Sequence, residues 1–267
     1  MYPAPPKSYK GVYPFKIGTT SFIYPDHIIP NVKMLGPYLD EIELLLFESA
    51  PDSLPTKQEI ITLATLATEL DLTYNIHLPT DVSPGDNNPS LRHHAVDTIK
   101  RIIDLTSPLP SSTLTLHLSY EESSNEKTIV KNWQKIVYKS MEQLISSGIK
   151  GKTLSIETLF YPFEWVENII TAFNLSVCMD IGHLILQKTD LETFFGRYSD
   201  LISIIHLHGV KNHRDHLPLD KLPEKEIGPV CRILKQFSGV VSLEVFSYKD
   251  LIASLQFLET CRQRYTL

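Results

Sequence analysis

The stretch between residues 178 and 216 concentrates side chains that bind metal ions. They form three closely spaced pairs: Asp180 with His183, His206 with His208, and Asp215 with His216. Imidazole and carboxylate groups are the ligands that divalent transition metals prefer. A single histidine is usually an ordinary core or surface residue, but three such pairs at the ends of two expected strands and in the loop after them predict a metal site.

The same residue types end six consecutive expected strands, at His77, His117, Glu157, Asp180, His206 and Glu244. Side chains alternate along a strand, so the residue two positions earlier points the same way. Those residues are Asn75, Thr115, Ser155, Cys178, Ile204 and Ser242, nearly all small or polar. A barrel without a site would fill these layers with bulky branched residues. We therefore expect a polar layer that leaves room for the strand-end groups and hydrogen-bonds to them.

The candidate ligands outnumber what one ion can use. A zinc ion takes at most about four protein ligands, whereas the candidates here are His77, His117, Glu157, Asp180, His183, His206, Asp215, His216 and Glu244. Either some of them bind substrate, or two or three ions share carboxylates. The mixed shell favours Zn or Mn over Ca and Mg, which prefer oxygen ligands. Clustered ions are a recurrent device for cleaving phosphoesters.

Eight short apolar runs, each followed by a helical pattern, must position these groups. The expected strands are 15–20, 42–47, 73–77, 114–118, 153–157, 175–180, 202–207 and 240–245. Near-continuous runs of Val, Ile, Leu and Thr are typical of buried parallel strands. Eight such units predict one (β/α)8 TIM barrel over residues 15–267, with residues 1–14 as an extended lead-in. The loops 79–89 and 119–126 follow strands, so they belong at the end of the barrel where such enzymes keep their sites.

Helix start signals support this division of the chain. Thr56 and Glu59 have the spacing of a capping box, and so do Thr189 and Glu192. The sequence from 225 to 237 contains Gly228-Pro229, which predicts a late start or a kink in that helix. No linker or repeat divides the chain, so a single domain is expected.

Charge and hydropathy exclude several classes of function. The net charge is −6 and the pI about 5.9, with no basic run, so neither nucleic acid nor an anionic membrane is expected as a partner. No apolar run has the length of a signal peptide core or a membrane span. The three cysteines show no pairing pattern. We expect a cytoplasmic enzyme with a small-molecule substrate.

The pattern from KIGTTSF to SLEVF resembles the xylose isomerase-like barrel superfamily, which includes sugar phosphate isomerases and epimerases and the endonuclease IV group (AP endonuclease family 2). The resemblance implies a central metal shell of Glu157, Asp180, His206 and Glu244. It implies a catalytic or further metal-binding role for His183, and metal ligation by His77 and His117. Asp215 and His216 are adjacent, whereas the endonuclease pattern separates its Asp and His by one residue, and His213 competes with them.

Several short motifs are similar to those of the cobamide remodeling phosphodiesterases: GTTSFIYPDHI, ELLLFES, DIGHL, IHLHG with RDHLPL, and SLEVFS. This resemblance implies a metal-dependent hydrolase that cleaves a phosphoester in the nucleotide loop of cobamides. Aromatic residues after the expected strands could stack on such a flat ligand. The candidate substrate-binding residues are Tyr24, Glu48, Phe160, Trp165, His208 and His213.

An alternative is a sugar or sugar-phosphate isomerase or epimerase with one divalent metal ion. Glu157 and Glu244 would then each bind the ion and exchange protons with carbon atoms of the sugar. The phosphodiesterase hypothesis also assigns catalytic roles to Glu157, Glu244 and His183. His77 and His117 separate the two hypotheses, because a one-metal epimerase does not need them. A DNA-repair endonuclease is disfavoured by the acidic charge of the chain.

Overall fold

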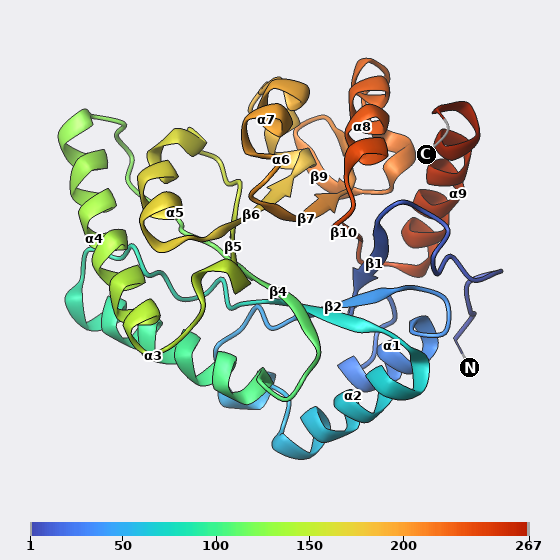
Figure 1. Cartoon of the computed structure of the whole chain (residues 1–267), viewed down its shortest axis with the longest axis horizontal. Coiled ribbons are helices and arrows are strands. Elements are labelled where there is room, and N and C mark those ends of the chain that lie inside the picture. The colour runs from blue at the N-terminus through green and yellow to red at the C-terminus, as the bar shows by residue number, and fades with distance from the viewer. Residues whose placement is uncertain (1, 266–267) are drawn as a thin grey trace.

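The computed structural model describes residues 2–265, which form a closed barrel of eight parallel strands surrounded by helices (Figure 1). The order around the barrel is β1-β10-β7-β6-β5-β4-β3-β2. The strands are β1 (Lys16–Thr20), β2 (Glu41–Leu45), β3 (Thr73–His77), β4 (Ser111–Leu116), β5 (Leu154–Glu157), β6 (Ser176–Asp180), β7 (Ile202–Leu207) and β10 (Val240–Leu243). The predicted (β/α)8 architecture is therefore confirmed, and each expected strand lies within a few residues of its observed position.

The helices are amphipathic and pack their apolar faces on the outside of the barrel. They are α1 (Ile28–Leu35), α2 (Lys57–Leu70), α3 (Pro89–Thr106), α4 (Lys127–Ser146), α5 (Glu167–Phe173), α6 (Ile181–Leu186), α7 (Leu191–Tyr198), α8 (Glu224–Gln236) and α9 (Tyr248–Tyr265). Short 3-10 turns occur at Pro51–Ser53, Gly151–Thr153, Phe163–Trp165 and Leu219–Lys221. None of the helices within residues 2–265 combines the length and apolar character that crossing a membrane requires.

The helix starts agree only in part with the sequence signals. The capping box of Thr56 and Glu59 is present at the start of α2. At α7 the cap is instead Asp190, whose carboxylate accepts a hydrogen bond from the Thr193 amide at 2.8 Å. Because α7 begins at Leu191, Thr189 lies one residue too early to cap it. Helix α8 begins at Glu224 and contains Pro229, so of the two predicted alternatives, a late start or a kink, the late start is wrong.

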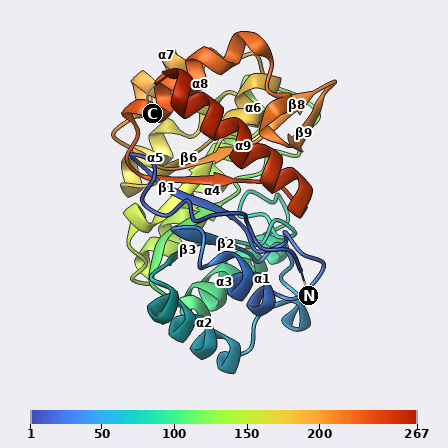
Figure 2. The same ribbon diagram turned by 90° about the vertical axis from the view of Figure 1, so that its right-hand side faces the viewer.

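A short antiparallel hairpin was not expected from the sequence. Strands β8 (Gly209–Lys211) and β9 (Arg214–Leu217) follow β7 and lie beside α6, at one end of the barrel in Figure 2. The two turn residues, Asn212 and His213, both have positive φ, as a tight hairpin turn requires. Asp215 and His216 are thus held on a strand rather than in the loop that the sequence predicted.

The polar layer inside the barrel bonds mainly to itself and to β2. The Ser155 hydroxyl lies 2.5 Å from the hydroxyls of both Thr113 and Ser203. The Asn75 amide donates to the buried carboxylate of Glu41 at 3.2 Å. The expected hydrogen bonds from this layer to the strand-end ligands are therefore largely absent among the described residues, although the layer leaves the predicted room.

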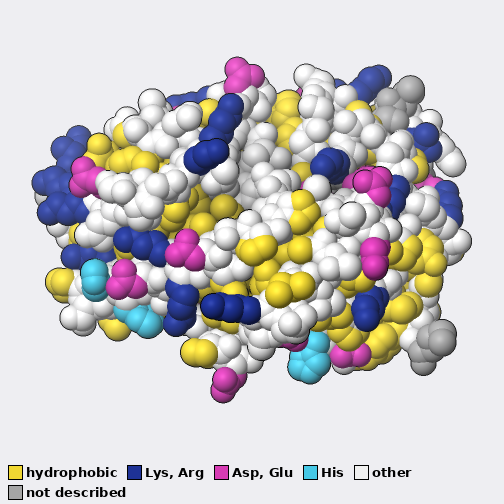
Figure 3. Space-filling model, turned by 60° about the horizontal axis from the view of Figure 1, so that its bottom comes forward, with side chains coloured by type: hydrophobic (Ala, Val, Ile, Leu, Met, Phe, Trp, Pro, Cys, Tyr) yellow, Lys and Arg dark blue, Asp and Glu magenta, His cyan; other side chains and the backbone are white. Residues whose placement is uncertain are grey.

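Residues 2–15 contain no helix or strand and pack against the barrel. Tyr9 is buried there, and the ring of Tyr13 stacks on Phe15 with centroids 5.1 Å apart. On the face drawn in Figure 3, Lys and Arg side chains are interspersed with Asp and Glu and with apolar patches. This mixture agrees with the modest net charge of −6.

Candidate functional site

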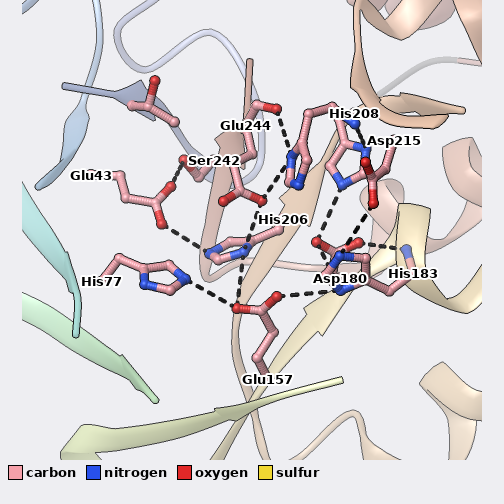
Figure 4. Close-up of polar contacts among 12 residues, drawn as sticks. Glu43, His77, Glu157, Asp180, His183, His206, His208, Asp215, Ser242 and Glu244 are labelled. Atoms are coloured by element: carbon pink, nitrogen blue, oxygen red, sulfur yellow. Dashed lines mark hydrogen bonds and ion pairs between the residues drawn. The ribbon is translucent and has the colours of Figure 1, made fainter. Parts of the chain in front are cut away.

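A cavity of about 530 Å³ opens at the end of the barrel where the strands finish. Its lining residues are Phe47, His77, Thr80, His117, Ser119, Tyr120, Glu157, Leu159, Phe160, Tyr161, His183, His216, Glu244 and Phe246. Parallel strands all present their carboxyl ends at this face, which is why residues far apart in the sequence meet there. The polar groups at its floor are drawn in Figure 4.

Glu157, at the end of β5, lies between two sets of histidines. Its Oε2 atom is 2.9 Å from Nε2 of His117 and 3.3 Å from Nε2 of His77. Its other oxygen, Oε1, is 3.3 Å from Nδ1 of His183. The carboxylate is buried, and its two oxygens face different groups of candidate ligands (Figure 4). Oε1 thus faces the ring nitrogen of His183, whereas Oε2 faces the Nε2 atoms of His77 and His117.

His77 has the hydrogen bonding of a metal-binding histidine. Its Nδ1 lies 3.0 Å from the carbonyl oxygen of Leu78 and can only donate to it. The neutral ring then carries its lone pair on Nε2, the atom that points at Glu157. Metal-binding histidines commonly donate their other ring N–H to a backbone carbonyl or a carboxylate in this way. His183 repeats the arrangement, because its Nδ1 lies 2.9 Å from the Thr158 carbonyl and leaves Nε2 free.

His206 forms the centre of a second group. Its Nδ1 is 3.3 Å from Oε2 of Glu244 and 3.6 Å from Oε2 of Glu157, while its Nε2 is 3.2 Å from Oε1 of Glu43. Metal bonds of about 2.0–2.2 Å at a tetrahedral angle place neighbouring ligand atoms roughly 3.3–3.6 Å apart. The spacing of His206, Glu244 and Glu157 therefore fits a shared ion.

Buried polar atoms without partners support the same interpretation. Both ring nitrogens of His206, Oε2 of Glu244 and Oε1 of Glu43 are buried and make no hydrogen bond. Leaving such an atom unsatisfied costs about 1–3 kcal/mol, and more for a charged group. Nδ1 of His206 and Oε2 of Glu244 face each other at 3.3 Å, so one bound cation would satisfy both. The donor set of imidazoles and carboxylates fits zinc or manganese.

Asp180 and the hairpin complete the ring of candidate ligands. Asp180 caps α6, where its Oδ1 accepts the His183 amide hydrogen at 2.7 Å. From the hairpin, Oδ2 of Asp215 reaches to 3.8 Å from Nε2 of His183. Nδ1 of His216 lies 3.5 Å from Oε2 of Glu244. All nine candidate ligands predicted from the sequence therefore come together at this one face.

The electrostatics keep the carboxylates ionised despite their burial. Burial raises the pKa of Glu157, but the charge of His117 and hydrogen bonds from three histidines outweigh it and hold the pKa well below its usual value. Burial lowers the pKa of His183, whereas Asp180 and Glu157 raise it, to about 10. The site therefore holds negative oxygens whose charge is balanced by imidazolium protons when no ion is bound. Metal binding would displace such protons.

Of the six predicted substrate-binding residues, only Phe160 lines the cavity, and the other five do not. Phe160 lines the cavity and is 61% exposed, so it remains available to a ligand. Tyr24 is buried and donates its hydroxyl hydrogen to the Pro3 carbonyl. Trp165 packs into an aromatic cluster with Tyr120, Trp133 and Tyr161 rather than into the cavity.

The remaining three lie away from the cavity. Glu48 accepts a hydrogen bond from Ser53 on the outer loop. His213 sits in the hairpin turn and lines a different cavity. His208 is buried beneath the site, with its Nε2 3.2 Å from Oδ2 of Asp180. Their expected contact with substrate has no geometric support, because loop and hairpin packing turns each of them elsewhere.

Glu43 is the site residue that the sequence analysis missed. It is fully buried on β2, contacts His206, and accepts a hydrogen bond from Ser242 at 2.5 Å. The signal was present, because Glu41 and Glu43 interrupt an otherwise apolar strand at alternate positions. Acidic residues are rarely buried without a partner, so two of them on one face of a buried strand mark a polar interior.

The structure is a closed parallel barrel with candidate metal ligands at the ends of six strands. Residues 31–261 match the model of the xylose isomerase-like TIM barrel family. The chain belongs to that family. A search of curated protein sequences found no significant match.

Solved structures with the same fold include several carbohydrate epimerases. A D-tagatose 3-epimerase-like protein aligns with a TM-score of 0.74 and 20% identity, covering 94% of this chain and 98% of that one. An L-ribulose 3-epimerase aligns with a TM-score of 0.73 and 15% identity, covering 94% of this chain and 96% of that one. The 3-keto-D-glucoside 4-epimerase of E. coli aligns with a TM-score of 0.70 and 15% identity, covering 93% of this chain and 99% of that one. At these identities the likeness establishes the fold.

Proposed function

We propose that this protein is a metal-dependent phosphodiesterase that acts on a small nucleotide-bearing molecule, with a cobamide nucleotide loop as the substrate. One observation carries the proposal: Oε2 of Glu157 lies between two groups of candidate ligands, with Nε2 of His77 and His117 at 3.3 and 2.9 Å and Nδ1 of His206 at 3.6 Å. A site for a single ion uses about four protein groups. The histidine pair on β3 and after β4 supplies ligands for a further ion.

These residues would hold two or more zinc or manganese ions, which would supply the Lewis-acid chemistry that phosphoester hydrolysis needs. The protein's own groups would position them. His206 and Glu244 would hold one ion, His77 and His117 another, and Glu157 would be a ligand available to both. His183 and His216 line the cavity above and can stabilise charge on the phosphate oxygens.

The cavity itself suits a phosphodiester with a large apolar portion. The described residues that line it include no Lys or Arg, so the charge of the phosphate would be met by ions and histidines. Phe160 and Phe246 are 61% and 42% exposed. Their rings stand beside His183 at 4.7 Å and His216 at 5.3 Å, and could contact a flat base.

A carbohydrate epimerase or isomerase is the second candidate, and the solved structures of the same fold favour it. Its support in the site is the placement of Glu157 and Glu244 on either side of Nδ1 of His206, at 3.6 and 3.3 Å. Two glutamates around one ion could exchange protons with opposite faces of a sugar carbon. This chemistry leaves the histidine pair at 77 and 117 without a role.

Product analysis separates the two candidates. The protein, loaded with Zn or Mn, is incubated with a cobamide and in parallel with ketoses and their phosphates, and the products are resolved by chromatography. We expect release of a base-containing riboside with the corrinoid ring intact, and no conversion of the sugars. An untouched cobamide together with ketose interconversion would assign the protein to the epimerases.

A further inference from the structure

His208 connects two parts of the site without lining the cavity. It follows the end of β7 and is fully buried. Its Nε2 lies 3.2 Å from Oδ2 of Asp180, the candidate ligand that ends β6. Its Nδ1 accepts the backbone N–H of His216, on the hairpin, at 2.9 Å. One imidazole therefore bridges the carboxylate of Asp180 and the hairpin that carries Asp215 (Figure 4).

The hydrogen bond from the hairpin fixes the tautomer of this ring. A backbone N–H can only donate, so Nδ1 of His208 must present its lone pair to His216. The neutral ring then carries its proton on Nε2 and donates it to Asp180. The Gly209 carbonyl, 3.3 Å from Nδ1, cannot compete, because that nitrogen has no proton to give. Donation to Oδ2 leaves Oδ1 of Asp180 to cap α6.

Gly182 lies directly against the imidazole ring of His208 and leaves no space for a side chain. A Cβ atom built on Gly182 would lie 2.0 Å from Cε1 of His208 and 2.6 Å from its Nδ1. These distances are far below van der Waals contact, so only glycine permits the imidazole to lie against the first turn of α6. Gly182 has no positive φ that would itself require glycine. The need for glycine here thus comes from the position of His208.

We infer that His208 is a positioning residue that locks Asp180 and the hairpin residue His216 into one arrangement. The inference rests on the proposed metal site, in which Asp180 is a ligand. Polar groups that orient metal ligands are typically worth about 10–100-fold in metal affinity. The ring joins the end of β6 to the hairpin, whose His216 lines the cavity.

Two near-isosteric substitutions separate the two contacts. In His208→Asn the amide oxygen takes the place of Nδ1 and can still accept from His216, but nothing replaces Nε2. In His208→Gln the amide nitrogen takes the place of Nε2 and can still donate to Asp180, while the acceptor for His216 is lost. We expect His208→Asn to weaken Zn or Mn binding about 10–100-fold and to preserve slow exchange of the His216 amide.

The converse is expected for His208→Gln. Metal affinity should stay within about threefold of the wild type, whereas the His216 amide should exchange at least about fivefold faster, as loss of one hydrogen bond predicts. Metal affinity is measured by calorimetric titration with Zn or Mn, and amide exchange by NMR. Neither measurement needs a substrate, so an error in the proposed reaction does not affect them.

Two further variants serve as controls. His213→Asn changes an exposed histidine in the same hairpin and should leave both quantities unchanged. Gly182→Ala should displace the imidazole and impair both together. If His208→Asn and His208→Gln behave alike, or if Gly182→Ala changes neither quantity, the positioning role is wrong. A wild-type protein that binds no metal would overturn the proposed function and the Asp180 half of the inference, leaving only the hairpin contact.

Discussion

Glu157→Gln is expected to reduce turnover by about 10³-fold or more while the barrel remains folded. The substitution keeps the shape of the side chain but removes the charge that faces His77, His117 and His183. An amide ligates metals weakly and cannot serve two ions, so the shared centre would be lost. The effect should be seen in kcat, because Glu157 would hold the ions that act on the phosphate, whereas Phe160 and Phe246 would contact the rest of the substrate.

Glu41→Gln is the matched control for this variant. Glu41 is equally buried, on β2, but its carboxylate bonds to Thr73, Asn75 and Ser112 and touches none of the candidate ligands. We expect Glu41→Gln to change the melting temperature without changing kcat in the folded protein. Near-normal turnover in Glu157→Gln, measured beside this control, would remove Glu157 from the reaction.

The second large effect, a loss of bound metal and of turnover, is expected when His77 and His117 are replaced. His77→Ala and His117→Ala should each lower metal occupancy, and the double variant should lose turnover by about 100-fold or more. Ligands that hold one ion act as a unit, so the double variant should lose little more than the stronger single variant. Metal analysis after dialysis, with circular dichroism to verify the fold, tests this expectation. Full occupancy and full activity in both single variants would contradict the two-ion site.

Much of the fold was predictable because buried parallel strands have nearly continuous runs of apolar residues in the sequence. The eight runs could be located without knowing their neighbours, and the candidate ligands were visible as the His, Asp or Glu that ends six of them. The hairpin could not be found in this way. Its strands, Gly209–Lys211 and Arg214–Leu217, are too short and polar to show a period.

The unsuccessful predictions share a physical cause. Tyr24 and Trp165 follow strands as Phe160 does, but whether a loop aromatic faces the cavity depends on what packs beside it. The two acidic residues on β2 mark a polar interior, but the contact of Glu43 with His206 joins residues far apart in the sequence. Such contacts are set by the closure of the barrel and cannot be derived from the local sequence.

The number of ions bound to the wild-type chain tests the central claim most directly. The metal-free protein is reconstituted with Zn or Mn, unbound metal is removed, and metal and protein are quantified in the same sample. The arrangement of ligands around Glu157 predicts two or more ions per chain. A single ion per chain, retained when His77 and His117 are both replaced by alanine, would contradict the shared site and favour the one-metal epimerase.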